Sequence, residues 1–255
     1  MEKIKLYGFN NLNKILIFCI YDVFYINEKK NYNKYIKYIN KKYNSERLTK
    51  ILKKICFSIG ASILNIAHQN YIPQGASSVI LFKENENYKN KKKFLINDYL
   101  MHLDKSHICI HTYPENIFKK KTNIFRIDLE ISTCGVISPL KIINYIINKF
   151  KSDVLSIDYH IRGFTRNIEN NKIYIDHKIN SIEDFISKKI LLKYKTKNIN
   201  IKKVNTFITK LILKKINLKN FIFSNELKNK NSKEKKEIIK KIKKNLKEIY
   251  NMKNI

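Results

Sequence analysis

Hydrophobic and polar residues alternate along two stretches of the chain. The residues between Ile124 and Ser132 are apolar at every second position. A stretch that begins at His107 has the same period, and its alternate positions carry reactive side chains: His107, Cys109 and His111. A period of two is that of a strand with one buried and one exposed face. The sequence therefore predicts two half-buried strands, the second with one chemically reactive face.

Three other stretches have the period of a helix. Ser45–Ile59 places apolar residues at i, i+3, i+4, i+7 and i+8, with Ser45 as the expected N-cap and Gly60 as the C-terminal stop. Pro139–Phe150 is a second predicted helix, and it begins with a proline, which the first turn of a helix tolerates. Ser232–Tyr250 is a third, basic helix with isoleucines and a leucine along one side.

The remaining apolar runs predict further strands. They cover Leu12–Tyr25, Ser62–Ile72, Ser77–Lys83, Asp153–Gly163 and Lys172–Asp176. A turn that contains Pro73 and Gly75 joins the second of these runs to the third, which is typical of a β-hairpin. Asn27–Lys42 is polar and is expected to be a loop or a surface helix. Beyond about residue 188 the chain becomes a mixture of lysine, asparagine and isoleucine.

Strands, hairpins and helices in this mixed order favour an α+β fold over a doubly wound sheet. We expect a two-layer α/β sandwich with a mainly antiparallel sheet and a C-terminal helical extension. The whole chain, residues 1–255, is expected to form one domain. No glycine-rich motif supports a dinucleotide-binding or P-loop fold.

The formal net charge of +31 allows two explanations. Such a charge favours binding to phosphates or anionic surfaces, so a basic nucleic-acid-binding protein is one hypothesis. The other explanation is compositional, because the chain is rich in lysine, asparagine, isoleucine and tyrosine and holds only five glycines and three prolines. An AT-rich genome encodes that composition, and the lysines are scattered along the chain without a single stripe.

Cysteine usage and hydropathy narrow the class of protein. The four cysteines have no C-x-x-C spacing, so neither a zinc site nor a small disulfide framework is predicted. The N-terminus has no signal-peptide pattern, and no apolar run is long enough to span a bilayer. We therefore expect a soluble, cytoplasmic protein with no membrane partner.

Proline and glycine indicate where the active region lies. All three prolines, together with Gly75 and Gly135, fall between residues 73 and 139. In a chain with so few residues of these two types, those that remain indicate backbone geometry that the protein requires. The active region is therefore predicted within residues 73–139, where three reactive side chains stand out: Ser106, His111 and Cys134.

These three residues allow more than one chemistry. Either Ser106 or Cys134 is a nucleophile with His111 as its base, as in a serine or cysteine hydrolase. An extended strand would hold Ser106 about 17 Å from His111, so a bend would be needed to join them. Alternatively, His107 and His111 are ordinary hydrogen-bonded strand residues, and Cys134 is a packed thiol before a tight turn.

Six segments of the chain together resemble one known family. They are Phe9–Leu12 (FNNL), Pro73–Ser77 (PQGAS), His102–Cys109 (HLDKSHIC), His111–Glu115 (HTYPE), Ser132–Pro139 (STCGVISP) and Arg162–Arg166 (RGFTR). In this order and spacing they are similar to those of prokaryotic S-adenosylmethionine decarboxylase proenzymes, in the longer form of Gram-negative bacteria. The resemblance runs from about residue 4 to the C-terminal helix and is weakest in the lysine-rich last third.

The resemblance implies an enzyme that makes its own pyruvoyl cofactor. By the family's pattern, the Ser106 hydroxyl attacks the carbonyl of Lys105, and elimination and hydrolysis then split the chain between these residues. Residues 1–105 become the β chain, and residues 106–255 become the α chain, with a pyruvoyl group made from Ser106 at its start. His111 matches the proton acceptor of this processing step. Ser77 matches a serine associated with the same step in the family's shorter relatives.

The resemblance also implies the reaction that follows. The pyruvoyl carbonyl forms a Schiff base with S-adenosylmethionine and takes up the electrons of decarboxylation, and Cys134 matches the proton donor. The product is the aminopropyl donor for spermidine biosynthesis. We assign Glu115 to the ribose hydroxyls of the substrate. Because long-form relatives need a divalent metal, Mg²⁺ is an expected cofactor, although no metal ligand is assigned. The family's assemblies imply four αβ pairs. No specific nucleic-acid partner is expected.

Overall fold

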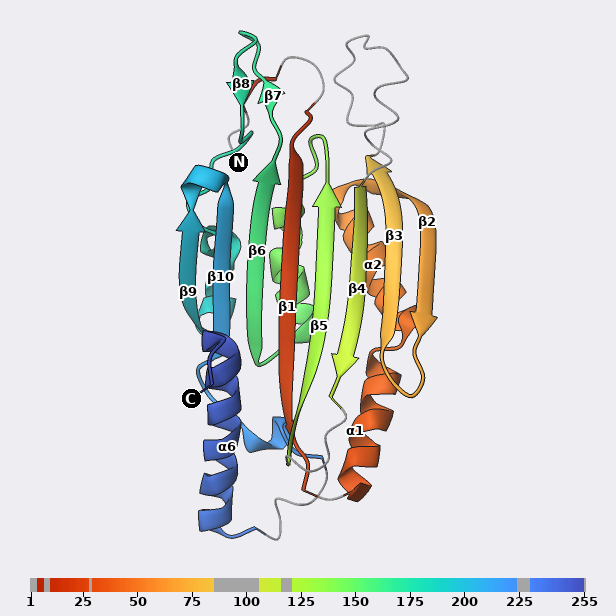
Figure 1. Cartoon of the computed structure of the whole chain (residues 1–255), viewed down its shortest axis with the longest axis vertical. Coiled ribbons are helices and arrows are strands. Elements are labelled where there is room, and N and C mark those ends of the chain that lie inside the picture. The colour runs from red at the N-terminus through yellow and green to blue at the C-terminus, as the bar shows by residue number, and fades with distance from the viewer. Residues whose placement is uncertain are drawn as a thin grey trace.

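An antiparallel sheet of eight strands organises the described part of the chain (Figure 1). The computed structural model describes residues 4–6, 10–27, 29–84, 106–115, 121–223 and 230–254. The sheet contains β1 Asn13–Tyr25, β2 Ala61–Asn70, β3 Ala76–Glu84, β4 Ser106–Pro114, β5 Thr122–Thr133, β6 Val154–Arg162, β9 Tyr194–Ile201 and β10 Thr206–Leu213. Its strands follow the order β2-β3-β4-β5-β1-β6-β10-β9. A separate two-stranded ribbon pairs β7 Thr165–Arg166 with β8 Lys172–Ile173.

Helices lie on both faces of this sheet. They are α1 Lys29–Lys42, α2 Ser45–Ile59, α4 Ile143–Phe150, α5 Lys188–Leu191 and α6 Ser232–Asn251, with short 3-10 segments η2 Pro139–Ile142, η3 Ile182–Phe185, η4 Lys202–Val204 and η5 Leu218–Asn220. In Figure 1, α2 lies behind the sheet, α1 lies beyond the lower ends of β3 and β4, and α6 extends downward from the lower end of β10. The main core forms on the α2 side, where Phe18, Ile110 and Leu129 are fully buried.

The helix α6 covers only one end of the other face. Its residues Ile238, Ile242 and Leu246 pack with Val23 and Tyr25 of β1 in a second, smaller core. The rest of that face is open, because every second residue of β1, β4, β5 and β6 is only partly buried there. The molecule therefore has two layers, and α6 adds a third layer over one end.

The helix α2 has the length that its periodicity predicts, but its N-cap differs. The side chain of Asn44, and not that of Ser45, accepts the N–H of Arg47. Ser45 is the first helical residue, and its Oγ lies 3.0 Å from Nδ1 of His68. Gly60 ends the helix with φ +82°, in the left-handed conformation that glycine adopts freely.

The α+β class, the β2–β3 hairpin and the alternating strands β4 and β5 are confirmed, and other predictions need correction. The predicted strand Lys172–Asp176 is a strand only over Lys172–Ile173, because the chain then leaves β7 and carries Asp176 to β1. Pro139–Phe150 starts as a 3-10 segment before it continues as α4. The lysine-rich region beyond residue 188 contains β9 and β10. The edge strand β9 is exposed over most of its length, so its sequence has no apolar alternation.

Candidate active site

The strand β4 carries candidate residues on both of its faces. Ser106 is its first residue and shares the helix-covered side with Ile110, whereas His111 shares the open side with Cys109. The pairing of β4 with β3 and β5 is unbroken, so no bend brings Ser106 to His111 within one chain. An extended strand of that length spans about 17 Å. The direct Ser106–His111 nucleophile and base pair is therefore not formed in a single chain.

Ser106 is buried beside Cys134. Its residue surface is 2% exposed, and its Oγ accepts a hydrogen bond from the backbone N–H of Cys134 at 3.2 Å. The contact arises because β5 pairs with β4 in opposite direction, so the end of β5 lies beside the start of β4. A backbone N–H in this position stabilises negative charge that develops on Oγ. Two of the three reactive residues predicted from the sequence therefore meet in space.

The turn after β5 is fixed through both backbone groups of Gly135. The Gly135 N–H donates to the carbonyl of Asn10 at 3.1 Å, and the Gly135 carbonyl accepts from Nζ of Lys14 at 2.6 Å. Gly135 has φ +73°, which residues with a side chain rarely adopt. The predicted tight turn beside Cys134 is confirmed, and its anchors come from the segment that enters β1.

Lys14 and Asp176 form a buried ion pair next to this turn. The Lys14 Nζ lies 3.0 Å from Oδ2 of Asp176, and the two side chains are 2% and 13% exposed. The carboxylate also accepts from Nδ2 of Asn10 at 2.6 Å and pairs with Nδ1 of His177 at 2.6 Å. Burial alone would raise the pKa of Asp176, but the His177 hydrogen bond and the Lys14 charge hold that pKa well below its usual range. The carboxylate is therefore ionised at neutral pH and balances the ammonium.

His111 and Ser77 are direct cross-strand partners on the open face of the sheet. The β3–β4 pairing places Ser77 opposite His111, and the β4–β5 pairing places Asp128 on the other side of His111. The hydroxyl of Tyr71 donates to Oγ of Ser77 at 2.8 Å. The structure thus joins the two predicted processing residues to each other, and within one chain it does not join them to Ser106.

The other cysteines have the properties of packed thiols. Burial raises the pKa of Cys19 to about 11, with a further contribution from the charge of Asp128. Burial also raises the pKa of Cys109, and it raises the pKa of Cys56 to about 12. Among the cysteines, Cys134 is the one whose backbone contacts Ser106.

Two other predicted residues are not part of the contact between Ser106 and Cys134 in the described part of the chain. Glu115 follows the far end of β4, and its Oε2 accepts the backbone N–H of Ile124 at 2.7 Å. Lys105, on the other side of the expected cleavage point, lies outside the described residues. The substrate-binding role of Glu115 and the cleavage role of Lys105 stay predictions.

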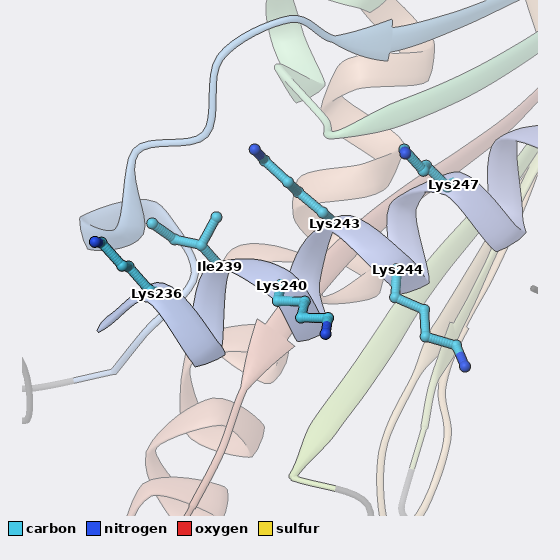
Figure 2. Close-up of a pocket in the computed structure, with 6 residues that line it drawn as sticks. All are labelled: Lys236, Ile239, Lys240, Lys243, Lys244 and Lys247. Carbon is cyan, nitrogen blue, oxygen red and sulfur yellow. The ribbon is translucent and has the colours of Figure 1, made fainter. Parts of the chain in front are cut away.

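The surface of α6 has a hollow that is lined mainly by lysines. Figure 2 shows it lined by Lys236, Ile239, Lys240, Lys243, Lys244 and Lys247, none of which is a candidate catalytic residue. Within the described ranges, no three side chains of His, Cys, Asp or Glu converge to hold a metal ion. None of the described helices combines the length and the apolar character that a membrane crossing requires.

Comparison with known proteins connects this geometry to one family. The family model described as S-adenosylmethionine decarboxylase matches residues 43–163, which include Ser77, Ser106 and Cys134. A protein of Buchnera aphidicola (subsp. Acyrthosiphon pisum, strain Tuc7) named S-adenosylmethionine decarboxylase proenzyme is 48% identical over 100% of this chain and 98% of its own. The chain belongs to the S-adenosylmethionine decarboxylase family. A relative of the same name from Photorhabdus laumondii is 45% identical over 100% of this chain and 99% of its own.

The sequence reading missed the roles of Lys14 and Asp176 in this decarboxylase-family chain. One signal was available, because the alternation of β1 requires an apolar residue at position 14, between Leu12 and Leu16. A lysine on that face is a departure from the pattern and indicates a buried partner. Asp176 lies 162 residues further along the chain, so no local pattern identifies it as that partner.

Proposed function

We propose that this chain is a pyruvoyl-dependent S-adenosylmethionine decarboxylase that makes the aminopropyl donor for spermidine biosynthesis. The observation that carries the proposal is the hydrogen bond from the Cys134 N–H to Oγ of Ser106. It joins the residue at the expected cleavage point to the expected proton donor, in a chain that belongs to the decarboxylase family. A pyruvoyl group at position 106 supplies the carbonyl that takes up the electron pair released by decarboxylation.

Self-cleavage between Lys105 and Ser106 is the first step. Ser106 Oγ attacks the carbonyl of Lys105, and the amide between the two residues becomes an ester. Elimination releases the Lys105 carboxylate, and hydrolysis of the dehydrated residue at position 106 releases ammonia and leaves a pyruvoyl group. The hydrogen bond from the Cys134 N–H fixes Oγ in position for the attack, while the negative charge of the tetrahedral intermediate develops on the Lys105 carbonyl oxygen.

The two products are a β chain of residues 1–105 and an α chain of residues 106–255. They stay joined after cleavage, because the sheet interleaves them. β1 lies between β5 and β6 in the sheet, so a strand of the β chain is bonded on both sides to the α chain.

Cys134 is the proton donor of turnover. The substrate carbon that has lost its carboxylate must accept a proton, and a positioned side chain speeds that transfer. An ordinary thiol is mostly protonated at neutral pH and can supply the proton. The backbone contacts of Gly135 hold the turn that carries this thiol.

The αβ pairs form a homo-assembly, of four pairs by family resemblance. His111 and Ser77 match the family's processing residues, yet they lie on the open face, about 17 Å along β4 from Ser106. Because Ser106 is buried on the helix-covered side, a second copy would have to bring its own His111 and Ser77 to the edge of the sheet where β4 begins. In this arrangement, processing depends on assembly.

Two further parts of the proposal rest on the sequence and its resemblance. A cytoplasmic location stays a prediction, and so does a requirement for Mg²⁺. The described residues present no cluster of metal ligands, so no step is assigned to the ion. The alternative of a basic nucleic-acid-binding protein accounts for the lysines of α6 in Figure 2, but it gives no reason for the contact between Ser106 and Cys134.

Release of carbon dioxide from carboxyl-labelled S-adenosylmethionine tests the function. We expect the purified protein to release the label, and we expect phenylhydrazine, a carbonyl reagent, to add to the chain that begins at residue 106 and stop the release. Addition to the chain is read by mass, so cofactor and activity are measured separately. A protein that releases no label and takes up no phenylhydrazine contradicts the proposal.

A further inference from the structure

Lys14 is the one lysine or arginine among the buried residues in the described part of the chain. None of the other lysines and arginines whose burial the structure describes is buried, so water reaches their positive charges. Removing an ammonium from water costs several kcal/mol, and a partner charge offsets this only when the geometry is good. A buried lysine near the start of the inner strand β1 is therefore a feature that stability alone does not explain.

The partners of Lys14 show what its ammonium holds. One of them, Asp176, is itself fixed by Asn10 and by His177. His177 in turn lies 3.3 Å from the hydroxyl of the buried Tyr159. The ammonium is therefore held in place by a buried polar network, and from there it donates to the Gly135 carbonyl at 2.6 Å.

We propose that Lys14 is a positioning residue for Cys134: its ammonium, fixed by Asp176, holds the Gly135 carbonyl and with it the turn that carries the proton donor. This inference rests on the proposed role of Cys134 in turnover. It adds that the β chain takes part in turnover after cleavage, because Lys14 belongs to residues 1–105 and the turn belongs to residues 106–255.

The effect of such positioning is large enough to measure. A displacement of about 1 Å between an acid and a reacting atom lowers a rate by up to about 100-fold. A loosened turn leaves the substrate contacts made elsewhere intact, so it lowers kcat with little change in KM. If the ion pair were purely structural, its loss would instead lower the melting temperature and leave kcat per folded enzyme unchanged.

The first test variant is Lys14→Met, which keeps an unbranched side chain and removes the charge. We expect it to cleave at residue 106 to completion, though more slowly because the turn also carries the Cys134 N–H, and the cleaved protein should have kcat about 10- to 100-fold below the parent and KM within about threefold. Alkylation of Cys134 by iodoacetamide, mapped by mass, should become severalfold faster than in the parent, with no change at Cys109. The matched control is Lys240→Met on the exposed face of α6, which should match the parent in every measurement.

A second variant separates positioning from stability. Lys14→Met leaves the Asp176 carboxylate buried without its cation, which lowers the melting temperature. The double variant Lys14→Met/Asp176→Asn removes both charges and should recover most of that loss. We expect its kcat to remain low and its Cys134 alkylation to remain fast, because the Gly135 carbonyl still lacks its donor.

Combining Lys14→Met with Cys134→Ala gives a double-mutant cycle. If Lys14 acts through Cys134, adding Lys14→Met to Cys134→Ala costs no further activity. Parental kcat in the cleaved Lys14→Met variant, recovery of kcat together with stability in the double variant, or fully additive losses would each overturn the inference. If the parent itself releases no carbon dioxide, the proposed function fails, and Cys134 alkylation still decides whether Lys14 holds the turn.

Discussion

The two ends of the short segment from Ser106 to His111 differ in almost every physical respect. Ser106 is 2% exposed, contacts the Cys134 backbone and lies beside a turn that the buried Lys14 network anchors. His111 is half-buried on the open face of the sheet, next to Ser77 in register. One end is a closed, preorganised environment, and the other end faces outward.

This difference suggests how one chain carries two kinds of chemistry. The closed end contains the residues proposed for turnover, which must stay fixed through many cycles. The open end contains the residues proposed for processing, which act once. Because the two groups lie on opposite sides of one strand, they can be separated by mutation, and the Ser106, Cys134 and His111 variants below each change one end.

The largest effect is expected from Ser106→Ala. Without Oγ there is no attack on the Lys105 carbonyl, so the chain should remain uncleaved and release no detectable carbon dioxide. Gel electrophoresis and the label-release assay check both outcomes. Ser156→Ala, which changes a half-buried serine on the open side of β6, is the matched control and should behave like the parent. Cleavage of Ser106→Ala at position 105 would contradict the assignment.

Cys134→Ala, at the closed end, should lower the rate of turnover and leave cleavage complete. We expect complete cleavage, because the backbone N–H that contacts Ser106 is retained, with kcat lowered by about 10²- to 10⁴-fold. Steady-state kinetics on the cleaved protein measure this loss. Cys109→Ala, which removes a thiol from the open face, should retain parental kcat. Full activity of Cys134→Ala would remove this cysteine from its role.

His111→Ala, at the open end, should slow cleavage and leave turnover nearly unchanged. We expect its cleavage to be slower by about 100-fold, as for the loss of a general base, while the fraction that does cleave keeps kcat within a few-fold of the parent. The extent of cleavage against time is read by mass.

A mixing experiment shows whether His111 acts on its own chain or on a neighbour. Co-expression of His111→Ala with Ser106→Ala should restore cleavage to His111→Ala chains, because the second variant supplies an intact His111 from the partner copy. If His111→Ala remains uncleaved in these mixed assemblies, the processing base acts within its own chain, and the proposed supply of His111 by a second copy is wrong.

The smallest effect is expected from Asp153→Asn, away from both ends. Burial, followed by the charge of Asp22, raises the pKa of Asp153 to about 8, and its carboxyl accepts the Val23 N–H. In an unfolded chain the pKa is about 3.9, so the stability that this group contributes is present below about pH 4 and is lost as the pH rises through 8.

Between pH 5 and pH 8.5, the parent should lose about 5 °C more in Tm than Asp153→Asn, whose side chain stays neutral. Thermal unfolding at several pH values measures the difference, and cleavage and kcat should match the parent. Equal pH dependence of Tm in the two proteins would contradict the raised pKa.

The sequence predicted those parts of the fold in which one face of an element is buried. The alternation in β4 and β5 and the period of α2 follow directly from burial of one side. The prediction of Ser45 as the N-cap of α2 was wrong because Asn44 and Ser45 are both good caps, and the extended backbone at Asn44 decides between them. β10 was missed because its neighbours in sequence are lysine-rich and its pattern covers only eight residues.

The site was predicted only in its residue types and in the roles that the resemblance supplies. The contacts within the site depend on the pairing of segments that are distant in the sequence, which the sequence does not show. Ser106 meets Cys134 because β4 and β5 are paired, and Ser77 meets His111 because β3 and β4 are paired. The Lys14–Asp176 pair joins the start of β1 to the segment after β8, and no periodicity in either segment identifies that contact.

Intact-mass analysis of freshly purified protein shows directly whether the chain cleaves itself at Ser106. We expect two chains, residues 1–105 and residues 106–255, and the second chain should be lighter by one ammonia than a chain that begins with serine. A single uncleaved chain in a preparation that decarboxylates S-adenosylmethionine would rule out the proposed self-cleavage, because activity would then not require a pyruvoyl group made from Ser106.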